Sequence, residues 1–139
     1  MTDENKRLNI AEEWQRAAQA AAAARLLAEH GMVAEAVSRA YFRVFYTVRA
    51  LLISVDREPR SHEGAQRFFN LAFVKPGLFP SADGRLVARL MKDRHDADDD
   101  ASSVWTSEDF ASLWPQLEDF CRRAEEYLRQ GGWLPAIDR

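Results

Sequence analysis

The 139-residue sequence has few of the residue types that mark several common classes of protein. It contains one cysteine, Cys121, which excludes an internal disulfide framework and a cysteine-rich zinc site and is typical of a reducing compartment. A basic excess is also missing, since the formal net charge is −3. This charge argues against a general nucleic-acid-binding protein, although it still allows a local basic cleft.

Long hydrophobic runs are absent as well. No apolar stretch approaches the roughly 20 residues that are needed to cross a bilayer. The first residues, Met1–Arg7, are charged and polar, unlike a secretory signal. We therefore expect a soluble cytoplasmic protein with one domain over residues 1–139, in which residues 8–130 form the core and residues 131–139 form a tail.

The sequence shows no strand-like alternation of apolar and polar residues and no internal repeat. Instead, apolar residues recur at three- and four-residue spacing, which is typical of helices with one buried face. We therefore predict an all-α fold, an antiparallel bundle of four long helices and one short helix. The long helices are expected at residues 8–30, 33–55, 84–100 and 107–130, and the short one follows Ser61.

The segment Val33–Val55 is expected to be the central helix. Its apolar residues cover nearly the whole circumference, and it contains no glycine or proline. It also carries Arg39, Arg43 and Arg49. Arginines on a largely buried helix must extend to solvent, pair with acids or point into a polar cleft, so this helix is also the expected wall of a site.

Local signals place the ends of the other elements. Asp3 or Asn9 can cap the first helix, and Gly31 suits its C-terminal end. Thr106 and Asp109 have the spacing of a capping box, which predicts the start of the last helix. Pro115 lies inside that helical pattern and predicts a kink or a later start.

The connection after the short helix is rich in turn residues. It contains two prolines and two glycines among aromatic side chains, so it is not expected to be helical. We expect its apolar side chains Phe73, Leu78 and Phe79 to enter the core.

The most unusual string in the sequence is the run from Arg94 to Asp100, in which a histidine and four aspartates follow the arginine. Arg94 follows Leu90 by one helical turn, so it continues the apolar stripe and is expected to point inward. The acids oppose the helix dipole, and solvation, pairing with arginines or a partner chain could compensate for this. A calcium loop is rejected because Ala101 and Ser107 occupy the positions that require glycine and glutamate. No metal or cofactor is predicted.

A family resemblance is carried by short strings in four places of the sequence. They are SRAYFRVF and RALL within Ser38–Leu52, the pair Ser61-His62, the segment FVKPGLFP at Phe73–Pro80, and RHDAD at Arg94–Asp98. Together they resemble the HEPN superfamily, in particular its small stand-alone prokaryotic branch. The resemblance extends over about residues 10–130.

The resemblance implies a helical bundle that commonly dimerises, with the fourth helix near the interface. In HEPN ribonucleases, an arginine, the polar residue after it and a histidine four to six residues beyond that polar residue build a metal-independent site across the dimer. The arginine would stabilise charge in the transition state and the histidine would transfer a proton. Here Arg94 and the polar His95 match the first half of the motif, but Asp99, Asp100 and Ala101 stand where the distal histidine is expected. His95 itself projects about 100° away from Arg94 around the helix axis.

The sequence therefore favours a HEPN-type component of a toxin–antitoxin or defence-like module that associates with RNA or a nucleotide or binds a partner protein. The partner implied by the family is a second copy of the chain or a minimal nucleotidyltransferase. Two alternatives stay open: an active metal-independent endoribonuclease that uses Arg94 with His95 or His62, and a structural adaptor. The candidate catalytic residues are Arg94 and His95, and the candidate binding residues are Arg39, Tyr41, Arg43, His62 and Asp98.

Overall fold

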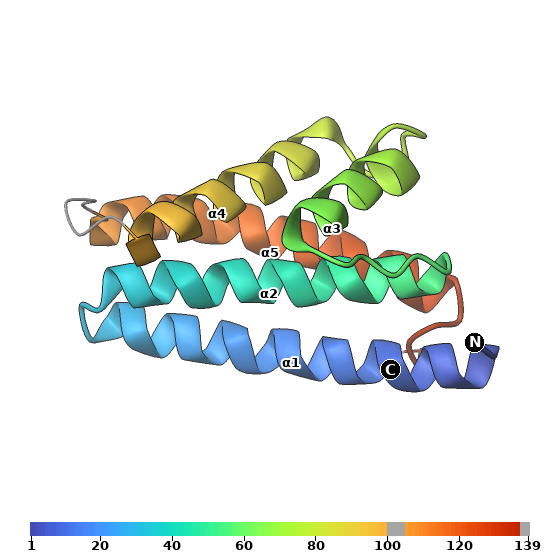
Figure 1. The fold of residues 1–139 in the computed structure, drawn as a ribbon. Helices are drawn as coiled ribbons and strands as arrows, with labels where there is room; N and C mark the ends of the chain where they lie inside the picture. The colour runs from blue at the N-terminus through green and yellow to red at the C-terminus, as the bar shows by residue number, and fades with distance from the viewer. Residues whose placement is uncertain (100–104, 137–139) are drawn as a thin grey trace.

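The computed structural model of the protein describes residues 1–99 and 105–136, and for residues 93–99 it describes the backbone alone. All of the regular structure in these residues is helical, which confirms the predicted all-α fold. The elements are α1 (Asp3–Glu29), α2 (Val33–Ser54), α3 (His62–Phe69), a π-helical turn (Asn70–Val74), α4 (Ser81–Asp99) and α5 (Ser107–Gln130) (Figure 1). Within the described residues, none of the helices is long and apolar enough to cross a membrane.

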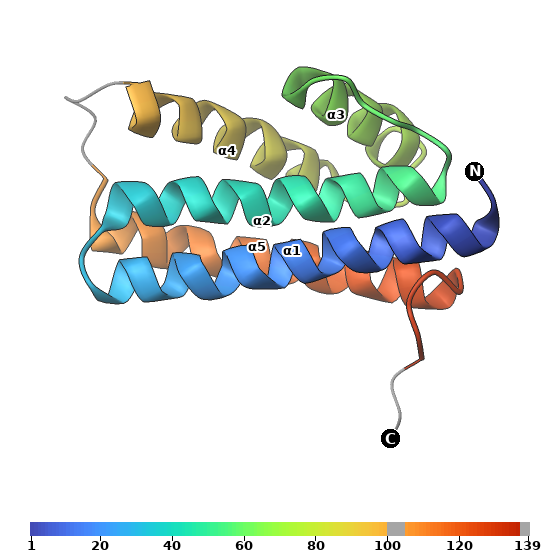
Figure 2. The ribbon, with the colours of Figure 1, turned by 60° about the horizontal axis from the view of Figure 1, so that its bottom comes forward.

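Helix α2 is the centre of the bundle, as the sequence predicts. It contacts each of the other four α-helices. Helix α1 lies beside it and runs in the opposite direction, whereas α3 and α4 lie on another side of it (Figures 1 and 2). Helices α1 and α2 are joined by a short turn in which Gly31 has a positive φ of 75°, a conformation that glycine adopts without strain.

Helix α1 begins earlier than predicted. Thr2 is the N-cap residue, and its hydroxyl accepts a hydrogen bond from the backbone N–H of Asn5 at 3.1 Å. Neither Asp3 nor Asn9 is the cap, so that prediction is wrong. The first turn is held in place by tertiary contacts of Lys6, which is buried, pairs with Asp56 at 3.2 Å and lies over Trp133. A purely local pattern contains no information about these contacts.

The connection between α3 and α4 follows the prediction only in part. Phe73 and Phe79 are buried and pack against one another, but Leu78 is 57% exposed, so its predicted burial is wrong. The chain turns at Gly77, where φ is 86°, and the N–H of Phe79 donates to the carbonyl of Phe73 at 2.9 Å. This turn directs Phe79 inward and leaves its neighbour Leu78 at the outer surface.

Helix α5 has the predicted start. The hydroxyl of Thr106 accepts from the N–H of Asp109, and the carboxylate of Asp109 accepts from the N–H of Thr106, both at 3.0 Å, which completes the capping box. Because the helix begins at Ser107, the alternative of a later start at Pro115 is wrong. Buried residues continue on both sides of the proline, at Leu113 and Leu117.

The first residues of the expected tail pack against the bundle. Leu134 is buried, and the ring of Trp133 lies 4.4 Å from the ammonium of Lys6. The carbonyl of Gly132 also accepts a hydrogen bond from Arg7 at 3.1 Å. The start of α1 and the segment after α5 therefore support each other at one end of the bundle.

Candidate functional site

The sequence-predicted site residues come from three helices. Arg39, Tyr41 and Arg43 lie on α2, and His62 is the first residue of α3. The last turns of α4 run beside the N-terminal half of α2 (Figures 1 and 2). They contain the backbone of Arg94, His95 and Asp98, whose side chains lie outside the described residues, as does the predicted inward direction of Arg94.

Tyr41 and His62 meet although they are 21 positions apart in the sequence. Tyr41 is buried, and its hydroxyl makes a hydrogen bond with Nδ1 of His62. Ser61 brings His62 to this place because it caps α3, with its hydroxyl accepting from the N–H of Gly64 at 2.9 Å. The cap fixes the first turn of α3 and so directs the imidazole toward α2.

Three further aromatic side chains of α2 surround this pair. Phe45 stacks on the imidazole with ring centroids 4.3 Å apart and an interplanar angle of 11°, and Phe42 meets it edge-on at 6.3 Å. Tyr46 packs against both phenylalanines. We call these residues the aromatic cluster: Tyr41, Phe42, Phe45, Tyr46 and His62. All except Tyr41 are partly exposed, so the cluster forms part of the surface of the bundle.

Two arginines lie at the edges of the aromatic cluster. The guanidinium of Arg39 is 4.7 Å from the ring centroid of Phe42, and that of Arg49 is 5.9 Å from the centroid of Phe45. Contacts of this kind stabilise by about 0.5–1 kcal/mol at exposed positions. These contacts keep the two guanidinium groups beside the partly exposed rings of Phe42 and Phe45.

Arg43 does not join this cluster. Its Nη1 atom pairs with Oε1 of Glu118 on α5 at 2.7 Å, and its guanidinium lies 5.0 Å from the ring centroid of Trp114. The side chain of Arg43 is 14% exposed, so this cation serves the packing of α2 against α5. Of the three arginines on the central helix, Arg39 and Arg49 are the two beside the aromatic cluster.

Sequence reasoning did not place Phe45, Tyr46 and Arg49 in the site. The signal was present, because Phe42, Phe45 and Arg49 follow one another at three- and four-residue spacing, and Tyr46 lies four residues after Phe42, so these side chains share one side of α2. On a helix that is apolar nearly all round, however, this pattern does not indicate which aromatic side chains stay partly exposed in the folded protein.

The arrangement can hold a planar, negatively charged molecule. Partly exposed rings provide stacking surfaces, and guanidinium groups bind phosphate or carboxylate. A metal-based chemistry has no such support, since the described residues contain no group of three or more histidine, cysteine or acidic side chains that could hold a metal ion.

Comparisons with known proteins agree with this fold. A family model of the HEPN domain matches residues 11–127. A protein of Methanocaldococcus jannaschii that is named a putative toxin is 31% identical over 108 residues, which cover 78% of this chain and 80% of that protein. A UPF0332 protein of Thermotoga maritima is 30% identical over 136 residues, or 97% of this chain and 93% of that protein. A UPF0332 protein of Gloeobacter violaceus is 31% identical over 123 residues, covering 83% and 92%. On the strength of the family match and these relatives, the chain belongs to the HEPN domain family.

Proposed function

We propose that this protein is an RNA- or nucleotide-binding component of a toxin-like module. The observation that carries the proposal is the aromatic cluster with Arg39 and Arg49 at its edges. The relative that is named a putative toxin supports the type of module. The partner would be a second copy of the chain or a minimal nucleotidyltransferase.

The cluster has the chemistry that single-stranded nucleic acids require. Stacking of a base on an aromatic side chain is worth about 1–3 kcal/mol and does not depend strongly on sequence. The protein as a whole has a net charge of −3, so attraction to the phosphate backbone has to come from local cations. With two arginines engaging two phosphates, the logarithm of the association constant should fall with the logarithm of salt concentration with a slope of about −1.4.

Binding can be tested with a fluorescent single-stranded RNA and anisotropy titrations. Phe45→Leu keeps an apolar group against His62 but removes a stacking surface, so it should weaken binding about fivefold or more. Arg39→Gln should weaken binding and reduce the salt slope. Arg122→Gln is a matched control, because it removes the same charge from an exposed arginine on α5. Equal affinities for the wild type and all three variants would contradict a site at the cluster.

A ribonuclease activity is the second candidate, and the position of His62 favours it. The hydrogen bond with Tyr41 and the stack with Phe45 hold the imidazole in a defined orientation at a partly exposed position, as proton transfer requires. The backbone carrying Arg94 and His95 runs beside the same half of α2 (Figure 1). In this function Arg94 would stabilise the charge that develops on the phosphate, and His62 or His95 would transfer the proton.

Cleavage is the measurement that separates the two candidates. Purified protein is incubated with mixed RNA in the presence of a chelator, beside Arg94→Ala, His62→Ala and His95→Ala variants. Cleavage that is lost in Arg94→Ala and in one histidine variant supports the ribonuclease and identifies its proton-transfer group. Binding without cleavage at high protein concentration supports a non-catalytic module. A stable complex with a partner protein and no RNA binding would instead support the structural adaptor.

A further inference from the structure

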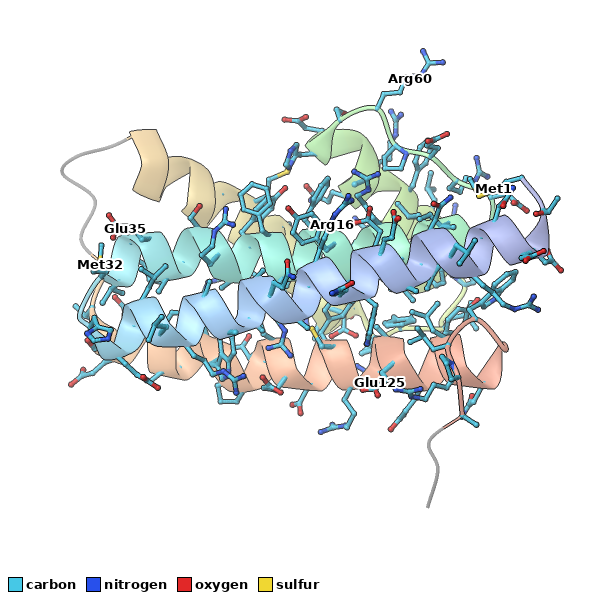
Figure 3. All side chains as sticks on the ribbon, turned by 90° about the horizontal axis from the view of Figure 1, so that it is seen from below. Met1, Arg16, Met32, Glu35, Arg60 and Glu125 are labelled. Carbon is cyan, nitrogen blue, oxygen red and sulfur yellow. The ribbon has the colours of Figure 1, made fainter. Side chains whose placement is uncertain are left out.

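A cleft lies next to the aromatic cluster, between the N-terminal half of α1, the end of α2 and the link that leads to α3. Its volume is about 410 Å³, and its charged lining consists of the three arginines and four carboxylates Arg16, Arg49, Arg57, Glu12, Glu13, Asp56 and Glu58. Figure 3 shows Arg16 on the edge of α1 that faces α3 in this view, whereas Glu125 of α5 lies on the opposite side. Arg49 lies between the aromatic cluster and the cleft, because its guanidinium is beside Phe45 and the residue also lines the cleft.

Glu13 is the unusual residue of this cleft. It is 4% exposed, which is rare for a carboxylate, and it lies between two cations. Its Oε1 atom accepts a hydrogen bond from Nη1 of Arg16 at 2.8 Å and lies 3.6 Å from Nη2 of Arg49. Its Oε2 atom is buried and has no hydrogen-bond partner among the described residues. A buried, ionised oxygen without a donor is unfavourable, so this atom calls for a donor that the described part of the chain does not supply.

The geometry points to a ligand with an N–H donor and an anionic group. The donor would satisfy Oε2 of Glu13, and Arg57, which is exposed on the link after α2, is available for the anion. Arg16 stands at the cleft with its side chain 52% exposed, so it can move aside when the donor enters. A nucleotide has both groups, and the volume of the cleft suits one.

We propose that this cleft reads one base of a single-stranded RNA whose neighbouring base stacks on the aromatic cluster, and that Glu13 selects bases with an exocyclic amino group. This inference rests on the proposed RNA binding. Cytosine presents its 4-amino group as a donor, and carboxylates accept from this group. Uracil has a carbonyl oxygen at the same position, which a carboxylate repels, and its remaining donor is the N–H at N3. A site in which Glu13 contacts the 4-position therefore favours cytosine over uracil.

The test compares two labelled oligonucleotides, octamers of cytidine and of uridine, which are both unstructured pyrimidine strands and differ at the 4-position. Anisotropy titrations with the wild type should show tighter binding of the cytidine octamer by about tenfold, as expected for one charge-assisted hydrogen bond. In Glu13→Gln the amide can both donate and accept, so the preference should disappear. Glu12→Gln is the control, because it removes the same charge from the adjacent, exposed carboxylate of the same cleft and should keep the preference.

The outcomes are distinct. Equal affinity of the wild type for the two octamers would overturn the base selection while leaving RNA binding in place. A preference that survives in Glu13→Gln would overturn the role of Glu13. Binding of neither octamer would remove the proposed RNA binding itself. Thermal melting of both glutamine variants is measured alongside. If Glu13→Gln is unfolded at the assay temperature, the wild-type comparison of the two octamers decides the base selection. Arg57→Gln then tests the anion contact and should weaken binding of both octamers equally.

Discussion

Asp83 and Arg123 show how much a buried charge depends on its partner. Asp83 is 2% exposed near the start of α4, and the guanidinium of Arg123 on α5 donates to both of its carboxylate oxygens, with Nε 2.9 Å from Oδ2. The hydrogen bond to Asp83 raises the pKa of Arg123, which further favours the charged form of the guanidinium. Bidentate geometry of this kind joins α4 to α5 at a fixed position.

Removing the two partners should have unequal effects. Arg123→Ala leaves a buried carboxylate without its cation and should lower the free energy of unfolding by about 3–5 kcal/mol. Asp83→Ala leaves an arginine whose side chain is 34% exposed and can regain water, so its cost should be smaller, about 1–2 kcal/mol. Urea denaturation of both variants measures the difference. Equal losses would contradict the asymmetric burial of the pair.

Cys121 is the second residue whose burial leads to a prediction that can be measured. Burial raises the pKa of its thiol, although the nearby Arg43 and a contact with Thr47 act in the opposite direction. The folded protein therefore holds the thiol proton more tightly than the unfolded chain does. The protonated thiol contributes to stability in full below the pKa of about 8.5 that it has in the unfolded chain. This contribution is lost as the pH rises above that value.

We therefore expect the thiol to react slowly with a disulfide reagent at pH 8 and to react fully after unfolding. The decline in stability between neutral and alkaline pH should be smaller in Cys121→Ala than in the wild type. Thiol titration and urea denaturation at several pH values provide the measurement. Rapid, complete reaction of the folded protein would contradict the burial.

At the scale of elements, each helix end is defined by a different kind of contact. Helix α5 starts with a reciprocal capping box of Thr106 and Asp109, which can be recognised from four consecutive residues. Helix α1 starts with a single local cap, in which the hydroxyl of Thr2 accepts from the N–H of Asn5, and Lys6 adds contacts with Asp56 and Trp133. These added contacts are with residues distant in the sequence, so the pattern of apolar residues did not show that the helix extends to Asp3.

The capping box gives a prediction for α5. Thr106→Ala removes the side-chain acceptor for the N–H of Asp109 and should lower the free energy of unfolding by about 1 kcal/mol. The backbone and side chain of Thr106 lower the pKa of Asp109, so the variant should also raise this pKa toward its ordinary value. The ionised Asp109 stabilises the protein above its ordinary pKa and this contribution is lost as pH falls, so the acid side of the stability profile should change as well.

Urea denaturation and a carboxylate titration followed by NMR measure the two effects. Ser107→Ala is the control, since this exposed residue is the first of the helix and not its cap. An unchanged pKa of Asp109 in Thr106→Ala would show that the side chain of Thr106 has no part in lowering it, since the variant keeps the backbone N–H that donates to the carboxylate.

At the scale of the whole molecule, the proposed homodimer decides whether a site could be built from two chains. We predict dimers in solution, with the last turns of α4 near the interface, because the resemblance to the HEPN superfamily implies this arrangement. Analytical ultracentrifugation over a wide range of concentrations measures the state. Monomers throughout this range would overturn the prediction and with it any site shared between two copies.

The amino-acid sequence by itself determined the all-α fold, the central place of α2 and the family, because helical periodicity, capping boxes and short motifs are local properties of the chain. It also pointed to Tyr41 and His62 as site residues, through the family motif. The tertiary structure alone decided that these two residues meet, that Arg43 turns away to Glu118 while Arg49 stays beside Phe45, and that Glu13 is buried between two arginines. The reason is physical: on a helix that is apolar on nearly all sides, the function of each side chain depends on which neighbouring helices cover it, and that is settled only when the helices pack.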